Sequence, residues 1–146
     1  MMTIAKKSSK SAKKKGGIVV RGKRKESIAK ATISKGHGVV RVNSLNVDAI
    51  PNRYTRELIL EPLHMAPEVA SGVDISVAVV GGGQMGQAQA VRMAIARALV
   101  EFANDPLLKE KMIARDRFLL AEDFRRVEPK KYLGPKARAR FQKSYR

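Results

Sequence analysis

The sequence predicts a two-layer α+β domain with basic tails, and three observations lead to this fold class. Residues 73–80 alternate apolar and polar side chains with a period of two, as a strand does when one face of its sheet is wet. Residues 88–102 place apolar side chains within an arc of about 100°, as a helix packed on a core does. At 146 residues, the chain is long enough for one such domain.

Charge is distributed unevenly along the chain. Residues 1–30 hold eleven Lys or Arg and one acid, residues 31–123 hold ten basic and eleven acidic residues, and residues 124–146 hold nine basic residues and one acid. Cationic ends that flank a neutral body repel each other unless a polyanion neutralises them. We therefore expect a nucleic acid partner, ahead of an anionic membrane surface.

Several classes of site and of targeting are disfavoured. The chain has no cysteine, and His37 and His64 lack nearby paired carboxylates, so we expect no metal, cofactor or catalytic site. No apolar stretch reaches the eighteen or so residues of a spanning helix. The lysine-rich start is not a secretory signal, although an organelle transit peptide and nuclear entry stay open.

The first half of the chain predicts three strands and one helix. Residues 18–21, 27–33 and 39–43 have strand patterns, and a polar turn at 35–38 separates the last two. A helix is expected to start near Asn52, and Pro62 makes its continuation difficult, which leaves His64 and Met65 in a loose connection. The side chains expected to face the core are Tyr54, Leu58 and Ile59.

The second half predicts a strand at 73–80, a long helix after the glycines, a shorter helix and a tail. The long helix is expected to turn one apolar stripe toward the core. Its solvent-facing side chains are expected to be Gln89, Arg97, Glu101 and Asn104. Asp105 is a plausible cap for a helix from Pro106 to about Ala114. From Phe124 the apolar periodicity is lost, which predicts an extended segment.

The glycines at 81–86 satisfy the pattern G-x-G-x-x-G, but their context argues against a dinucleotide site. The preceding strand carries Asp74 and Ser76 on its wet face, and no second strand follows the helix to present an acid. A phosphate-binding P-loop is excluded because Gln87 and Ala88 replace the required Lys and Ser/Thr. Two interpretations stay open: a steric turn alone, or a turn whose helix amides also bind an RNA phosphate.

No carboxylate cluster in the sequence resembles a catalytic site. Asp116 and the pair Glu122 and Asp123 come nearest. They are expected to cap helices or to pair with the neighbouring arginines Arg115, Arg117, Arg125 and Arg126.

Three separated motifs resemble the family of the universal ninth protein of the small ribosomal subunit, in its archaeal and eukaryotic branch. They are Gly-Lys-Arg-Lys-Glu-Ser-Ile-Ala-Lys-Ala at 22–31, Gly-Gly-Gly-Gln-Met-Gly-Gln-Ala at 81–88 with Arg92 and residues 95–99, and the ending at 136–146. The resemblance covers about residues 18–146. Residues 132–136 depart from the usual aromatic-Gly-Gly-Pro-Gly pattern of that branch, which affects the expected path of the tail.

The resemblance implies a mainly four-stranded sheet with helices packed on one face, like domain two of ribosomal protein S-five, at 18–123, and an extended basic tail at 124–146. Residues 1–17 lie outside the resemblance and are expected to form a basic disordered arm. It implies a non-catalytic protein of the cytoplasmic ribosome, present once in the head of the small subunit beside other head proteins. Its partners are the 3′ major domain of the ribosomal RNA and the anticodon stem-loop of peptidyl-site tRNA. The implied tRNA-binding residues are Lys143, Ser144, Tyr145 and Arg146. The expected ribosomal-RNA-binding residues are Arg21, Lys23, Arg24, Lys25, Lys30, Gly82, Gly83, Gln84, Gln87, Arg92, Arg125, Arg126, Lys130, Lys131, Lys136, Arg138 and Arg140.

Two rival functions follow from the residues alone. A chromatin-like or general nucleic-acid protein with basic arms would bind duplex DNA and structured RNA equally at the same salt. A small nucleotide-dependent oxidoreductase would require saturable binding of NAD or ATP, and no acid–base pair supports it.

Overall fold

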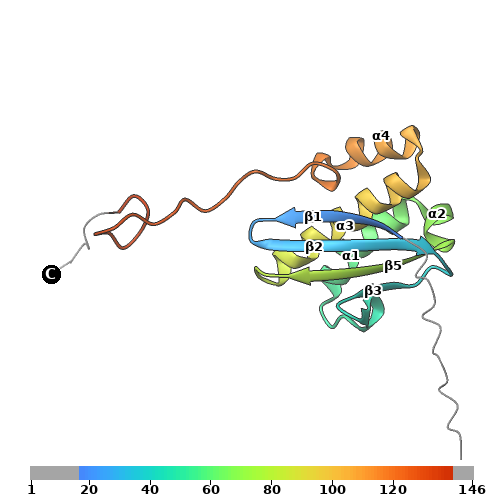
Figure 1. The fold of residues 1–146 in the computed structure, drawn as a ribbon, viewed down its shortest axis with the longest axis horizontal. Helices are drawn as coiled ribbons and strands as arrows, with labels where there is room; N and C mark the ends of the chain where they lie inside the picture. The colour runs from blue at the N-terminus through green and yellow to red at the C-terminus, as the bar shows by residue number, and fades with distance from the viewer. Residues whose placement is uncertain (1–16, 140–146) are drawn as a thin grey trace, which may run out of the picture.

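Five strands form one mixed sheet in the order β1-β2-β5-β3-β4, and the helices cover one of its faces (Figure 1). The computed structural model describes residues 17–139. The strands are β1 (Ile18–Arg24), β2 (Ser27–Lys35), β3 (Val40–Val42), β4 (Leu45–Asn46) and β5 (Val73–Val80). The helices are α1 (Arg53–Met65), α2 (Pro67–Ser71), α3 (Gln84–Ala103) and α4 (Pro106–Arg115), with 3₁₀ turns η1 (Val47–Ala49) and η2 (Arg117–Leu119).

This architecture confirms the predicted α+β class. Four strands were expected, and the fifth, β4, has two residues, too few to give a periodic pattern in the sequence. The expected arm at 1–17 lies outside the described residues except for Gly17, and so do Arg140 and the last six residues.

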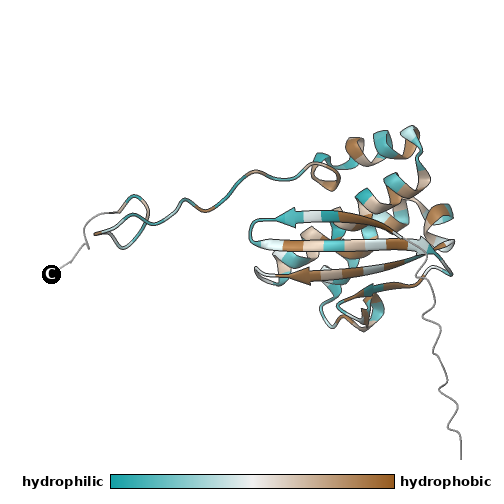
Figure 2. Ribbon diagram, in the orientation of Figure 1, coloured by the Kyte–Doolittle hydropathy of each residue, from teal (hydrophilic) through white to brown (hydrophobic). Residues whose placement is uncertain are grey.

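The sheet is exposed on one face, as its alternating pattern predicted. β2 pairs antiparallel with both β1 and β5, while β3 runs parallel to β5. In β2 and β5 the odd-numbered side chains are buried, except Lys35 at the end of β2, and the even-numbered ones face away from the helices. The alternation is visible as bands of hydropathy along these strands (Figure 2).

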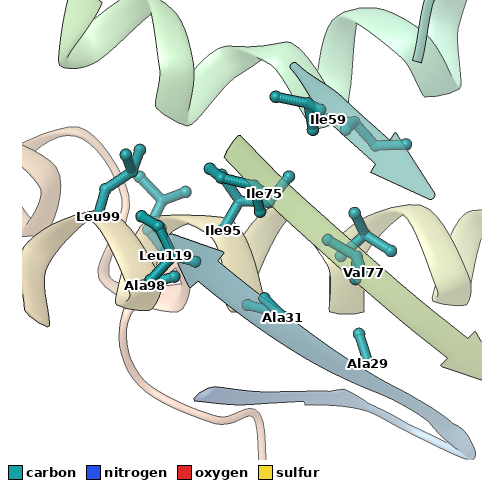
Figure 3. Packing of buried hydrophobic residues seen from close by; sticks show 14 of the residues in the cluster. Ala29, Ala31, Ile59, Ile75, Val77, Ile95, Ala98, Leu99 and Leu119 are labelled. Atoms are coloured by element: carbon teal, nitrogen blue, oxygen red, sulfur yellow. The ribbon is translucent and has the colours of Figure 1, made fainter. Parts of the chain in front are cut away.

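The long helix α3 is buried more completely than predicted. The prediction that only one apolar stripe of α3 is buried was too narrow. The sheet packs on one side of α3, and α1, α4 and η2 pack on its other sides. Ile95, Ala98 and Leu99 pack close to Leu119 and to the strand residues of the core (Figure 3). The fully or nearly buried residues of α3 are Ala88, Ala90, Val91, Met93, Ala94, Ile95, Ala96, Ala98 and Leu99.

Gly22 lets β1 approach α3 closely. A Cβ atom at Gly22 would overlap the backbone of Ala90 and would lie 2.7 Å from the backbone nitrogen of Ala94. Since real Cβ atoms do not approach backbone this closely, the contact between β1 and α3 requires glycine at this position.

The first helix is longer than predicted. It starts after Asn52, whose side chain accepts hydrogen bonds from the backbone N–H groups of Tyr54 and Thr55, but it continues through Pro62. Proline removes one backbone hydrogen bond, and the burial of Pro62 in the core offsets that loss. His64 and Met65 therefore belong to the last turn of α1 and not to a loop, and the short helix α2 follows.

The inward face of α1 also differs from the prediction. Tyr54 is 64% exposed, whereas Thr55 and Ile59 are buried. Thr55 can take the inward position because its hydroxyl donates to the carbonyl oxygen of Asn52 at 2.8 Å, which satisfies the polar group.

The C-terminal part of the described chain agrees with the predicted caps. Asp105 accepts a hydrogen bond from the backbone N–H of Leu107 at 3.0 Å, at the start of α4. Residues 120–139 contain no helix or strand. Residues 120–123 still contact the domain, and from Phe124 the path leads away from it (Figure 1). Within residues 17–139, no helix combines the length and the apolar character needed to cross a bilayer.

Candidate RNA-binding surface

The β1–β2 hairpin places cations at one end of the sheet. Lys25 occupies the two-residue turn with φ at 52°, and it is exposed. Arg21 and Lys23 lie on the open face of β1, because their strand alternates with the period of two. Lys30 follows on the open face of β2 and is exposed.

The glycine loop packs against that hairpin. The Ser27 hydroxyl donates to the carbonyl oxygen of Gly81 at 3.0 Å, and the side-chain amide of Gln87 donates to the same oxygen at 3.1 Å. Gly81 and Gly82 have φ values of 76° and 67°. A Cβ atom at Gly82 would collide with the Ser27 hydroxyl, and one at Gly81 would lie 2.6 Å from the carbonyl oxygen of Glu26.

Gly83 differs from its two neighbours. It has ordinary backbone angles, and a Cβ atom there would meet no atom within 4 Å. It stands at the N-cap of α3 without a side chain to accept from the first amides, and Gln84 and Met85 after it are exposed. The steric interpretation thus accounts for Gly81 and Gly82, while the start of α3 stays open to an anion.

The sheet does not have the topology of a dinucleotide fold. β5 pairs antiparallel with β2, and α3 leads into α4 without a strand between them. The exclusion of a dinucleotide site is therefore confirmed by the order and the direction of the strands.

Three of the expected RNA-binding arginines pair with carboxylates of the domain. Arg24 contacts Asp123, whose side chain is 2% exposed, and Arg125 contacts the same carboxylate at 2.8 Å. Arg92 contacts Asp116 at 2.8 Å, and its Nε lies 2.7 Å from Glu61 Oε2 without the alignment of a hydrogen bond. Arg24 and Arg92 therefore attach the segment after α4 to the domain, whereas the pair of Arg125 with Asp123 lies within that segment.

Asp116 is held by hydrogen bonds from a backbone amide and from a guanidinium group. Burial alone would raise its pKa, but the hydrogen bonds from the backbone N–H of Phe118 and from Arg92 outweigh burial and lower the pKa of Asp116. The predicted capping role of Asp116 and the predicted pair of Asp123 with Arg125 are confirmed. The partners Arg24 and Arg92 were missed, since no local pattern connects positions so far apart in the sequence.

Arg97 is the clearest correction on α3. It was expected to face solvent, but its Nε donates to the carbonyl oxygen of Leu120 at 2.7 Å and its Nη1 donates to that of Arg21 at 2.8 Å. A salt bridge of 3.3 Å joins it to Glu122. The Arg97 side chain thus donates hydrogen bonds to the backbone carbonyl oxygens of Leu120 and Arg21, which would otherwise lack a partner from a neighbouring strand.

The remaining predicted cations are exposed in the segment after the domain. Arg138 contacts Glu128 at 2.9 Å. The others that the structure describes there are Arg126, Lys130, Lys131 and Lys136. Arg140 and the four residues expected to bind tRNA lie outside the described part of the chain.

Comparison with known proteins identifies the family. A family model described as ribosomal protein S9/S16 matches residues 22–146. The chain is 47% identical over 125 residues to "Small ribosomal subunit protein uS9" of Methanothrix thermoacetophila, which covers 86% of this chain and 95% of the relative. It is 48% identical over 126 residues to the protein of the same name from Halobacterium salinarum, covering 86% and 96%. The chain therefore belongs to the ribosomal protein S9/S16 family and is a structural component of the small ribosomal subunit, not an enzyme.

Proposed function

We propose that this ribosomal protein of the cytoplasm binds the small-subunit RNA in the head of the subunit, next to other head proteins, and that its last residues contact peptidyl-site tRNA. The observation that carries the RNA contact is the meeting of the β1–β2 hairpin and the glycine loop at one end of the sheet (Figure 1). The buried Ser27 holds the two loops together.

This end of the domain offers two kinds of phosphate contact. Lys23 and Lys25 supply mobile point charges, and the uncapped start of α3 supplies backbone N–H groups with the positive end of the helix dipole. The absence of a side chain at Gly83 leaves room for an RNA backbone to approach those amides. Arg24 supports this surface from within, since its guanidinium is paired with Asp123.

Cross-linking in assembled subunits tests the RNA contact. A photoreactive residue in place of Lys25 is expected to form adducts with ribosomal RNA, while the same residue in place of the exposed Lys109 on α4 serves as the control position. Adducts from position 25 to protein alone, or equal RNA yields from both positions, would contradict the proposed surface. Equal affinity of the free chain for duplex DNA and structured RNA at the same salt would favour general nucleic-acid binding instead.

A further inference from the structure

The face of the sheet that the helices leave open carries cations and hydroxyl groups, with the exposed apolar side chains of Val19 and Val80 near its margins. No helix of the described chain covers it (Figure 1). Arg21, Lys23, Lys30 and Arg41 lie on this face, and Arg41 was not among the residues that the sequence singled out. Its centre carries only short side chains, those of Thr32, Ser34, Ser76 and Ala78.

The strand register aligns these side chains across the whole sheet. Val19 of β1 stands opposite Thr32 of β2, Thr32 opposite Ser76 of β5, and Ser76 opposite Arg41 of β3. Between β2, β5 and β3 the surface forms a hollow of about 260 Å³. It is lined by the polar residues Thr32, Ser34, Ser76, Arg41 and Asp74 and by the apolar residues Val39 and Ile75. The hollow therefore presents hydroxyl donors and acceptors beside one guanidinium group and one carboxylate.

The charges of this face are not balanced within the described chain. Arg21 stands directly opposite Lys30, and like charges in that position destabilise a sheet. Arg21 has one distant acidic neighbour, Glu122 at 3.9 Å, and is 56% exposed. Lys30 and Arg41 take part in no salt bridge among residues 17–139.

Asp74 is the one carboxylate on the open face within the described residues. Its Oδ1 accepts hydrogen bonds from the backbone N–H groups of His37 at 2.8 Å and Val39 at 3.0 Å. These amide bonds, that of Val39 first, lower the pKa of Asp74, so the carboxylate stays ionised and fixed at the rim of the hollow. A fixed carboxylate repels phosphate but accepts a hydrogen bond from a ribose hydroxyl.

We infer that the open face of the sheet is a second RNA-binding surface, on which the hollow takes a ribose and the surrounding cations contact the adjoining phosphates. The inference rests on the proposed binding of ribosomal RNA and extends it from the β1–β2 hairpin, with which the open face shares Lys23, across the sheet to the hollow. RNA fits this face better than a protein does, because the cation excess is complementary to phosphate and the hydroxyl-lined centre is complementary to 2′-hydroxyl groups.

Two charge-neutralised variants of the full-length chain distinguish the contribution of the open face to RNA binding from a general effect of lower net charge. Lys30→Gln with Arg41→Gln removes one Lys and one Arg from the open face, while Lys109→Gln with Arg53→Gln removes the same charges from α4 and α1. Against transcribed head-domain RNA near 0.1 M salt, we expect the first variant to bind roughly ten- to fiftyfold more weakly, with a log–log salt slope lower by about 1.8. The control variant should stay within about threefold of wild type.

A variant without a charge change tests the hollow itself. Ser76→Leu fills the space next to Arg41 and is expected to weaken RNA binding severalfold, with a smaller effect on a deoxyribose strand of the same sequence. Thermal unfolding of Lys30→Gln with Arg41→Gln is expected at wild-type temperature or above it, because the repulsion with Arg21 is relieved. If the Lys30→Gln with Arg41→Gln variant unfolded at a lower temperature than wild type, its weaker RNA binding would be explained by misfolding and the inference would be overturned.

The outcomes distinguish this inference from the proposed function. A wild-type chain that does not bind head-domain RNA refutes RNA binding as such. A wild-type chain that binds, with both neutralised variants equally weakened, refutes only the role of the open face. A photoreactive residue in place of Thr32 in assembled subunits is expected to cross-link to RNA, and cross-linking to a protein instead would assign the face to a neighbouring subunit protein.

Discussion

At the scale of single residues, the three consecutive glycines have different physical roles. Positions 81 and 82 require glycine because their φ angles are positive and the β1–β2 hairpin lies close to them. At Gly83, an added Cβ atom would meet no atom within 4 Å. The sequence could exclude a nucleotide site from the context of the glycines, because the alternation of the preceding strand and the missing second strand are local patterns. It could not assign Ser27 as the residue that fixes the loop, since the contact spans 54 positions.

A pair of alanine substitutions tests this division. Gly82→Ala forces a side chain into a left-handed backbone and against Ser27, and we expect it to lower the free energy of unfolding by about 1–3 kcal/mol. Gly83→Ala occupies open space with an ordinary backbone and should cost less than about 1 kcal/mol. Urea unfolding of the two full-length variants measures both values. Equal losses would mean that the hairpin contact does not constrain the loop.

At the scale of elements, carboxylates and arginines attach the chain after α4 to the two-layer domain. Leu119 of η2 is fully buried beside α3, and Arg92 and Arg24 hold Asp116 and Asp123 on either side of it. The boundaries of β5, α3 and α4 follow from periodicity and caps, which are local. The reach of α1 past Pro62 and the inward role of Arg97 depend on partners from distant segments, and no local pattern predicts them.

Removing the Asp116 carboxylate is expected to destabilise the domain in a pH-dependent way. Asp116→Ala loses the bond to the Phe118 amide and a partner of Arg92, at a cost of about 1–3 kcal/mol at pH 7. Because the pKa of Asp116 is lower when folded than when unfolded, its contribution is complete above the unfolded pKa near 4 and is lost as pH falls through the folded pKa.

The measurement is the difference in unfolding free energy between Asp116→Ala and wild type at neutral and at acid pH. Glu110→Ala, which removes an exposed acid of α4, serves as the control and should show little difference at either pH. A difference for Asp116→Ala that persists unchanged at pH 3 would contradict an ionic origin and indicate a packing defect.

At the scale of the whole molecule, the balanced domain carries most of its acids away from the surfaces proposed for RNA. Within the described residues, Asp74 is the one carboxylate on the open face of the sheet. Glu61 of α1 and Asp116 and Asp123 after α4 pair with arginines. The strongly positive sequence predicted a polyanion as the partner. The two-layer fold places three cations of the basic first stretch, Arg21, Lys23 and Lys30, on the open face of the sheet. Which cations serve the fold and which face outward could not be predicted without the packing.

The C-terminal end of the chain is expected to act on tRNA separately from the domain. The 23 residues from Phe124 can extend over roughly 75–83 Å, far enough to cross a layer of folded RNA, so a short deletion at the tip should separate tRNA contact from assembly. We expect subunits whose protein lacks Lys143 to Arg146 to assemble and sediment normally but to release peptidyl-site tRNA faster. Loss of Arg146 alone should cost no more than about 1–3 kcal/mol, because it is one charge-assisted contact among many.

Purified subunits allow the two effects to be measured separately. The off-rate of peptidyl-site tRNA is compared with that of subunits carrying Lys109→Gln and Arg53→Gln, which change charge on the helical side and leave the C-terminal end intact. An unchanged off-rate after the deletion would refute the tRNA contact and leave RNA binding by the domain untouched. If the subunits failed to assemble, the last four residues would instead be needed to bind ribosomal RNA. Assembly of the subunit head takes place before tRNA binds, so a defect at that step cannot come from a lost tRNA contact.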